Sequence, residues 1–66
     1  MYKRNVIHCE SLYFDHKLYS FEVYQQREYC EIYVNDEFYA SADDLTEALG
    51  EINILKERVR NGQEIM

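Results

Sequence analysis

Two histidines and two cysteines in this sequence can ligate zinc or act as nucleophile and base: His8, Cys9, His16 and Cys30. His8 and Cys9 are adjacent, and adjacent side chains of a strand point to opposite faces, so this pair does not form a catalytic dyad. The spacings among the four residues match no known zinc pattern. We therefore expect no bound metal, and a small zinc-binding module is kept only as an alternative interpretation.

Glu22 and Glu31 are a pair of carboxylates of the kind that catalyses glycoside hydrolysis, the second type of chemistry that the sequence suggests. A chain of 66 residues is too short to build the cleft that a sugar needs, and its two glycines form no phosphate-binding loop. We therefore expect a non-enzymatic protein with no catalytic residue and no cofactor.

The acidic residues are the most prominent chemical feature of the sequence. The net charge is −6, and residues 28–55 carry eight carboxylates and no Lys or Arg, whereas the segments on either side each sum to +1. A negative field repels nucleic acid and anionic lipid and attracts basic surfaces. We therefore expect a protein partner with a basic surface, and no direct contact with nucleic acid or membrane.

Length and composition indicate one small folded domain, residues 1–66. A domain of this size is marginally stable, but 47% hydrophobic residues and seven tyrosines argue against disorder. Two cysteines do not make a disulfide scaffold. The first ten residues lack the apolar run of a signal peptide, and no segment approaches the roughly 20 apolar residues that cross a bilayer. We expect a cytoplasmic chain with free thiols, for which self-association is an available aid to stability.

Alternation with period 2 predicts a β-rich region over residues 5–41. Strands are expected at 17–25 and 28–34, at 5–14 with a break near Glu10–Ser11, and at 37–40. Turns are expected at Asp15–Lys17, at Gln26–Arg27 (or a longer loop there) and at Asn35–Asp36. One face of the two central strands is apolar and is expected to carry Tyr19, Phe21, Val23, Cys30, Ile32 and Val34.

A helix is predicted over residues about 42–61, followed by a short tail over 62–66. Ser41 is the expected N-cap, Asp44 follows three residues later, and Gly62 suits the position after the helix end. An apolar stripe recurs at helical spacing through Leu45, Ala48, Leu49, Ile52, Leu55 and Val59. The predicted fold is α+β: a small antiparallel meander of three to four strands with one C-terminal helix packed on one face.

The opposite face of the central hairpin is the candidate binding site. If Val23 faces Cys30, Glu22 faces Glu31, a destabilising pair that suits a face meant to receive a cation. The expected partner-binding residues are Glu22, Tyr24, Tyr29, Glu31 and Tyr33, with Asp36, Glu37, Asp43, Asp44, Glu47 and Glu51 extending the acidic field. The alternatives are a solvated face with a different register, and turn or helix-start roles for the later carboxylates.

Gly50 and Ile54 form a possible secondary contact. Gly50 in mid-helix costs ~1 kcal/mol relative to alanine, and both residues fall opposite the apolar stripe. A single exposed apolar residue is also normal.

The stretch "EIYVNDEFYASADDLTEALGEI" (31–52) is similar to the middle of HicB-type antitoxin domains in its strand, turn, strand and capped helix. The leading hypothesis is an acidic inhibitor or decoy that acts as a nucleic-acid mimic on a nucleic-acid-handling protein. Phage or mobile-element anti-defence proteins, such as anti-CRISPR or anti-restriction proteins, are the analogous class. The alternative hypothesis is a homodimeric regulatory or antitoxin-like module.

Overall fold

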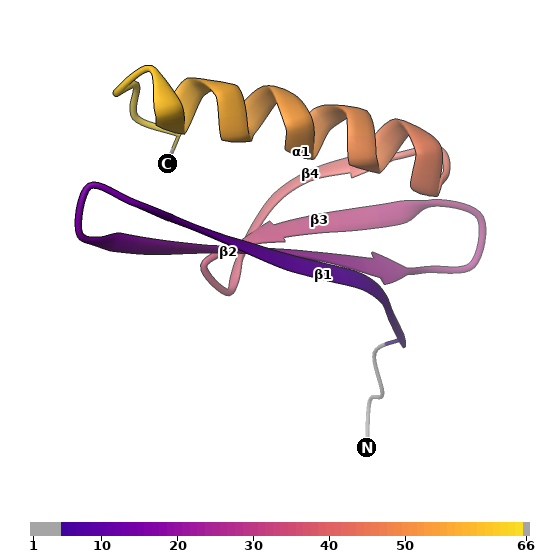
Figure 1. Cartoon of the computed structure of the whole chain (residues 1–66). Coiled ribbons are helices and arrows are strands. Elements are labelled where there is room, and N and C mark those ends of the chain that lie inside the picture. Colours follow the sequence, from indigo (N-terminus) through magenta and orange to yellow (C-terminus); the bar gives the residue numbers. More distant parts are fainter. Residues whose placement is uncertain (1–4, 66) are drawn as a thin grey trace.

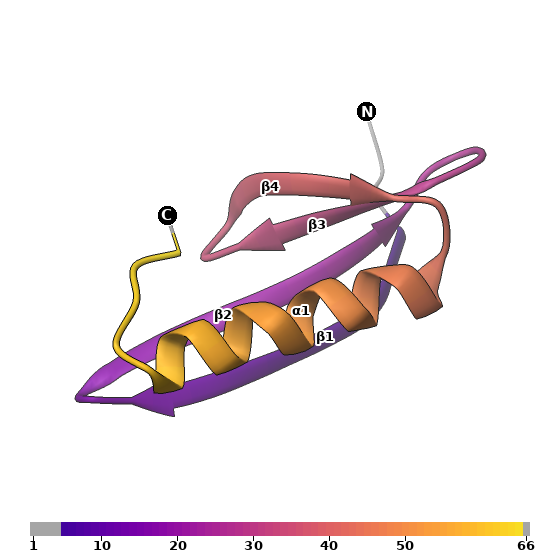
Figure 2. The ribbon, with the colours of Figure 1, turned by 90° about the horizontal axis from the view of Figure 1, so that it is seen from above.

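A computed structural model describes residues 5–65 of the chain as four strands and one helix. These are β1 (Asn5–Phe14), β2 (Lys17–Gln25), β3 (Cys30–Val34), β4 (Glu37–Ala42) and α1 (Leu45–Arg60). The strands form one antiparallel sheet in the order β1-β2-β3-β4. Helix α1 lies across one face of this sheet (Figure 1), and its axis crosses the sheet obliquely (Figure 2). The predicted α+β fold is confirmed.

Two hairpin turns follow directly from their residue types. Asp15 and His16 have φ of 53° and 64°, and Asn35 and Asp36 have φ of 51° and 69°. Two successive residues with positive φ match the right-handed twist of the flanking strands. Asn and Asp adopt this conformation more readily than most other L-residues. The first and third predicted turns are therefore present, and they fix the pairing of β1 with β2 and of β3 with β4.

Strand β1 has the predicted bounds and is more regular than the sequence indicated. Glu10 and Ser11 pair with β2 without interruption, so the predicted break at these residues is wrong. The irregularity lies nearer the start, where Val6 and His8 pair with neighbouring residues of β2 and Ile7 is the extra residue of a bulge.

The pairing of β2 with β3 differs from the predicted register by two residues. Val23 lies opposite Ile32 rather than opposite Cys30, so the predicted pair of Glu22 with Glu31 is wrong, and each glutamate lies opposite a tyrosine. Like charges directly opposite one another are destabilising, which favours the observed register. A shift of two residues keeps each side chain on its predicted face of the sheet.

The shift arises at the connection between these strands. A tight turn at Gln26–Arg27 is not formed, because the loop spans residues 26–29, two residues more than the tight turn, and closes where the Gln26 N–H donates to the Tyr29 carbonyl at 2.8 Å. The Gln25 side-chain amide donates to the carbonyls of Gln26 and Tyr29 at 2.7 and 3.2 Å. Tyr29, expected in the strand 28–34, therefore lies in the loop, and β3 starts one residue after it.

Helix α1 begins three residues later than predicted. The N-cap is Asp44 rather than Ser41, and its carboxylate accepts the Glu47 N–H at 2.9 Å. Glu47 Oε1 in turn accepts the Asp43 N–H at 3.4 Å. Ser41 is instead part of β4, which continues to the buried Ala42. Burial of Ala42 thus extends the strand and moves the N-cap from Ser41 to Asp44.

The end of α1 has the geometry that the sequence predicted. Gly62 has φ of 77°. Its N–H donates to the Val59 carbonyl at 3.0 Å, and the Gln63 N–H donates to the Arg58 carbonyl at 2.8 Å. This pair of bonds is the Schellman motif, in which glycine provides the left-handed residue.

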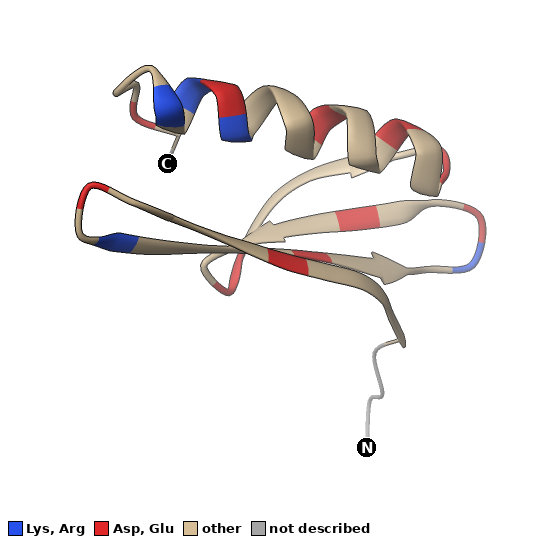
Figure 3. Ribbon diagram, viewed as in Figure 1, with Lys and Arg blue, Asp and Glu red and all other residues tan. Residues whose placement is uncertain are grey.

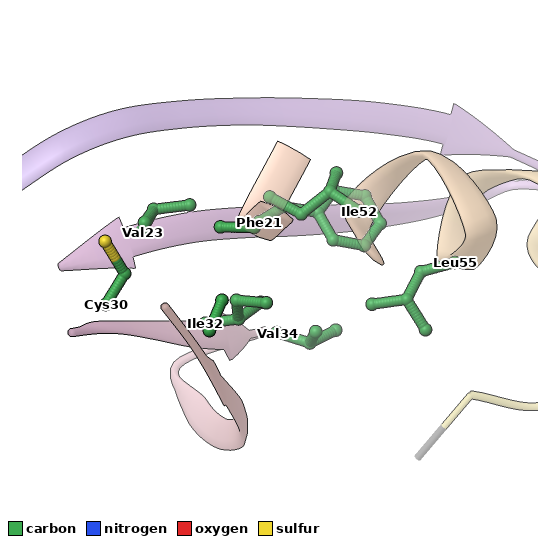
Figure 4. Close-up of a cluster of buried hydrophobic side chains, with 9 residues drawn as sticks. Phe21, Val23, Cys30, Ile32, Val34, Ile52 and Leu55 are labelled. Carbon is green, nitrogen blue, oxygen red and sulfur yellow. The ribbon is translucent and has the colours of Figure 1, made fainter. Parts of the chain in front are cut away.

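The core lies between α1 and the helix-facing side of the sheet (Figure 4). Its fully buried side chains are those of Phe21, Val23, Cys30, Ile32 and Val34 from the sheet and Ala48, Ile52, Leu55 and Val59 from the helix. The predicted helix stripe and the predicted inward faces of β2 and β3 therefore meet. Within the described residues, no helix is long and apolar enough to cross a membrane.

Candidate partner-binding face

The side of the sheet away from α1 has no element packed on it among the described residues (Figure 1). We call this side the open face. Because directly paired residues of antiparallel strands share a face, the pairings assign to it Val6, Cys9, Ser11, Tyr13, Leu18, Ser20, Glu22, Tyr24, Glu31, Tyr33, Phe38 and Ser41. This set contains glutamates and aromatic residues and no Lys or Arg.

A row of three aromatic rings crosses β2, β3 and β4 on the open face. The Tyr24 and Tyr33 ring centroids are 4.9 Å apart with planes at 69°, and those of Tyr33 and Phe38 are 5.8 Å apart at 76°. Both are edge-to-face arrangements, which stabilise a pair by about 0.5–1.5 kcal/mol beyond area burial. The rings therefore hold one another in place, although Phe38 is 53% exposed. Such a row offers rigid apolar area at little entropic cost on binding.

Two carboxylates are interleaved with these rings. Glu22 lies opposite Tyr33 and Glu31 lies opposite Tyr24, so the four side chains alternate in a two-by-two block. We call these four residues the tyrosine–carboxylate block. The Tyr24 hydroxyl donates to Glu22 Oε1 at 3.3 Å, and the Gln26 side-chain amide donates to Glu31 Oε1 at 2.8 Å.

These donors are neutral, so they orient the two carboxylates without cancelling their charge. Within residues 5–65, neither Glu22 nor Glu31 forms an ion pair; the pairs that are present involve Glu10 and Glu57. A guanidinium or ammonium placed over the block would meet aromatic faces and carboxylates together. Cation–π contacts contribute about 0.5–2 kcal/mol, the larger values applying when the cation is desolvated.

Next to the block, the open face is hollowed. A shallow cavity of about 440 Å³ is lined by Cys9, Glu10, Ser11, Leu18, Ser20, Phe21, Glu22 and Asp36. Three of its open-face side chains are small, those of Cys9, Ser11 and Ser20, and Glu22 and Asp36 bring carboxylates to it. The hollow therefore gives a long basic side chain room beside the block.

The predicted partner-binding residues do not form one surface. Glu22, Tyr24, Glu31 and Tyr33 lie together on the open face, and Asp36 reaches it from the β3–β4 turn. Tyr29 is exposed in the β2–β3 loop, and Glu37 is exposed at the start of β4.

The later carboxylates lie in the helix layer. Asp43 and Asp44 precede α1, and Glu47 and Glu51 lie in its first half, on the other side of the sheet from the block (Figure 3). Asp44 and Glu47 also make the capping bonds of the helix. The sequence placed these residues in one acidic field, whereas the fold divides them between two layers.

Gly50 and Ile54 are both exposed on α1, as predicted, and Ile54 is 49% exposed. A Cβ added at Gly50 would meet nothing within 4 Å, so packing within the described chain does not require glycine there. The partner contact at this spot stays a prediction.

The histidines and cysteines that could have carried chemistry are dispersed. Cys9 is exposed on the open face and Cys30 is buried on the helix side, so both are free thiols, as predicted. Burial, with a smaller effect of the Asp44 charge, raises the pKa of the Cys30 thiol. Among residues 5–65 there is no cluster of three or more His, Cys, Asp or Glu placed to hold a metal ion.

His8 belongs to a small polar network on the helix side of β1. His8 Nε2 lies 2.8 Å from Glu10 Oε2, and Lys56 Nζ donates to Glu10 Oε1 at 2.6 Å. The hydrogen bond from Lys56, followed by that with His8, lowers the pKa of the Glu10 carboxyl. The network ties the C-terminal half of α1 to the edge strand.

Phe38 is the main residue of the open face that was not predicted from the sequence. The signal was present, because a two-residue turn at Asn35–Asp36 pairs Val34 with Glu37 and therefore Tyr33 with Phe38. The hollow had no such signal, since it depends on how β1 and β2 place small side chains side by side.

Comparisons with protein-family models, with curated proteins and with solved structures find no match to this chain. The similarity to HicB-type domains therefore rests on the order of its elements alone.

Proposed function

We propose that the protein is a small non-enzymatic interaction domain whose open face occupies a basic surface of a partner protein. The observation that carries the proposal is the tyrosine–carboxylate block: two glutamates without ion-pair partners in residues 5–65, each held opposite a tyrosine. Arg and Lys of a partner match this block in charge and in cation–π geometry.

The best-motivated partner is a protein that handles nucleic acid. Such proteins expose Lys and Arg to phosphates, and an array of carboxylates can compete for the same cations. The net charge of −6 adds long-range attraction to a basic surface. The protein then acts as an inhibitor or decoy of anti-defence type, with Asp36 and Glu37 extending the contact beyond the block.

Charge reversal with a matched control tests this proposal. Immobilised parent chain is compared with Glu22→Lys plus Glu31→Lys, and with Glu57→Lys plus Glu64→Lys, in capture from a bacterial lysate eluted by a salt gradient. Both variants change the charge equally, but Glu57 and Glu64 are exposed near the end of α1, away from the block.

A nucleic-acid-handling protein that is retained by the parent and the control and lost by the open-face variant supports the proposal. Equal retention by all three chains contradicts it, because binding then does not depend on the block. Elution at moderate salt is expected, since screening weakens contacts between exposed charges.

A homodimeric regulatory or antitoxin-like module is the second candidate. The observation that favours it is the apolar exposure of the open face, where Tyr13 and Leu18 are 68% and 61% exposed. Two open faces packed together would bury these residues but would also oppose four glutamates. Loss of Tyr13 exposure on self-association, measured by chemical iodination of the tyrosines, would favour this candidate.

A further inference from the structure

The sheet has two edges, β1 and β4, and they differ in how well they are guarded. An edge strand offers backbone N–H and C=O groups to another chain, and proteins usually block it with short strands, bulges, charges or proline. β4 has six residues, begins with Glu37 and contains a bulge at Tyr39. β1 has ten residues and contains no Lys, Arg or Pro. Apart from a bulge at Ile7 near its start, β1 lacks these devices and is therefore the less guarded edge.

The regular part of β1 runs from His8 to Phe14, after the bulge at Ile7. Its one charged residue, Glu10, is bonded to Lys56 of the helix and to His8. That carboxylate is therefore directed to the helix side and held there by a cation. It does not repel a strand that approaches the edge in the plane of the sheet.

Exposed apolar side chains also gather at this edge. Val6, Ile7 and Tyr13 are three of the seven large hydrophobic residues that are exposed within residues 5–65, and Leu18 lies opposite Tyr13 on β2. The eight carboxylates of residues 28–55 belong to the loop before β3, to β3, β4 and their turn, and to the first half of the helix segment. Two chains that meet along β1 therefore approach through strands that carry Glu10, Glu22 and Lys17, whereas β3 and β4 carry Glu31 and Glu37 and no cation (Figure 3).

We propose that β1 pairs antiparallel with β1 of a second copy of this chain, about a two-fold axis at Ser11. Directly opposite residues of antiparallel strands share a face, so an axis through one residue keeps both helices on one side of a continuous eight-stranded sheet. Ser11 is the midpoint of the regular stretch from His8 to Phe14. This register places Tyr13 opposite Cys9 of the second copy, beside the apolar group of the edge.

The proposed dimer leaves both open faces uncovered, so it does not depend on the function proposed above. Its response to salt is also opposite to that expected for the contact with a basic partner. Each chain carries a net charge of −6, so screening reduces the repulsion between two copies. Added salt should strengthen the dimer, whereas it should weaken the contact with a basic partner.

Disulfide trapping tests the pairing and its register. In the Cys9→Ser background, Ser11→Cys is compared with Ser41→Cys, a matched exposed serine on the open face of the other edge strand. Residues facing each other across the axis have Cα atoms about 4.5–5.5 Å apart, within disulfide range. Two copies of residue 41 lie roughly seven strand spacings of 4.8 Å apart, or about 34 Å.

On mild oxidation, Ser11→Cys should form a covalent dimer roughly tenfold faster than Ser41→Cys. Sedimentation equilibrium of the parent chain should show a dimer that tightens with salt. A parent chain that stays monomeric at about 100 µM, or equal cross-linking of the two variants, would overturn the proposal. A dissociation constant of about 100 µM corresponds to a free energy of dimerisation of roughly −5 kcal/mol.

Discussion

Replacing Lys56 by methionine removes the ammonium that joins α1 to the edge strand, while keeping most of the aliphatic stem. Lys56 Nζ donates to Glu10 Oε1 at 2.6 Å, and the two side chains are only 20% and 26% exposed. Exposed ion pairs contribute about 0.2–1 kcal/mol, and breaking a buried pair costs about 3–5 kcal/mol. For this intermediate burial we expect the free energy of unfolding to fall by about 1–2 kcal/mol at neutral pH.

The loss should depend on pH in a defined direction. The bonds from Lys56 and His8 lower the pKa of Glu10 below its ordinary value of 4.5. A carboxyl with a depressed pKa in the folded state contributes stability above its unfolded pKa, and that contribution disappears as the pH falls through the folded pKa. The difference between the parent and Lys56→Met should therefore shrink as the pH falls from about 5 to about 3.

Urea unfolding of the parent and of Lys56→Met, at neutral pH and at about pH 3, measures this effect. In thermal unfolding, each kcal/mol lost should lower the midpoint temperature by about 4–8 °C in a domain of this size. Arg60→Met is the control, because its pair with Glu57 is 3.4 Å long and exposed, and it should cost less than about 0.5 kcal/mol. An equal loss at both pH values, or an equal loss in the control, would refute the argument from charge.

Three further outcomes are expected from equilibrium unfolding. Ile52→Ala should cost about 2–4 kcal/mol because Ile52 is fully buried, while Ile54→Ala on the exposed side should cost less than about 0.5 kcal/mol; similar losses would mean that the helix face is misassigned. Asp44→Ala should cost about 1 kcal/mol by removing the N-cap bond to the first turn, and no loss would refute the cap. Gly50→Ala should stabilise the chain by up to about 1 kcal/mol since a Cβ there meets nothing. Gly62→Ala should destabilise it by about 1 kcal/mol because φ is 77°. Shifts of the same sign in the two glycine variants would contradict one of these two assignments.

The faces of the strands could be predicted from the sequence because they depend only on period 2. Phe21 and Val23 stay inward whether β2 pairs with β3 in one register or in another two residues away. The register itself was not predictable from alternation. It depends on the loop, where the side chains of Gln25 and Gln26 donate to loop carbonyls and to Glu31.

The N-cap shows a different limit. Ser41 and Asp44 are both good capping residues, and local preference alone does not choose between them. The choice is made by Ala42, which is buried in the core and therefore keeps β4 extended past Ser41. Burial of Ala42 in the core therefore prevents Ser41 from capping the helix, and Asp44 is the N-cap.

The division of the acidic residues could not be predicted for a related reason. Glu31 and Glu47 are sixteen positions apart in a continuous acidic segment, yet one lies on the open face and the other on the helix layer. Charge along the chain predicts the sign of the field but not which carboxylates a partner meets together. The packing of α1 on one side of the sheet decides which carboxylates share a surface.

The central claim is that the carboxylates of the open face, and not those at the helix start, bind the basic partner. Isothermal titration of the captured partner against Glu22→Gln plus Glu31→Gln, and against Asp43→Asn plus Glu47→Gln, tests it most directly. Both variants remove two negative charges. The open-face variant should bind about tenfold or more weakly, which corresponds to about 1.4 kcal/mol, and the helix variant should change affinity by less than about threefold. The reverse order of these two effects would contradict the assignment of the binding face.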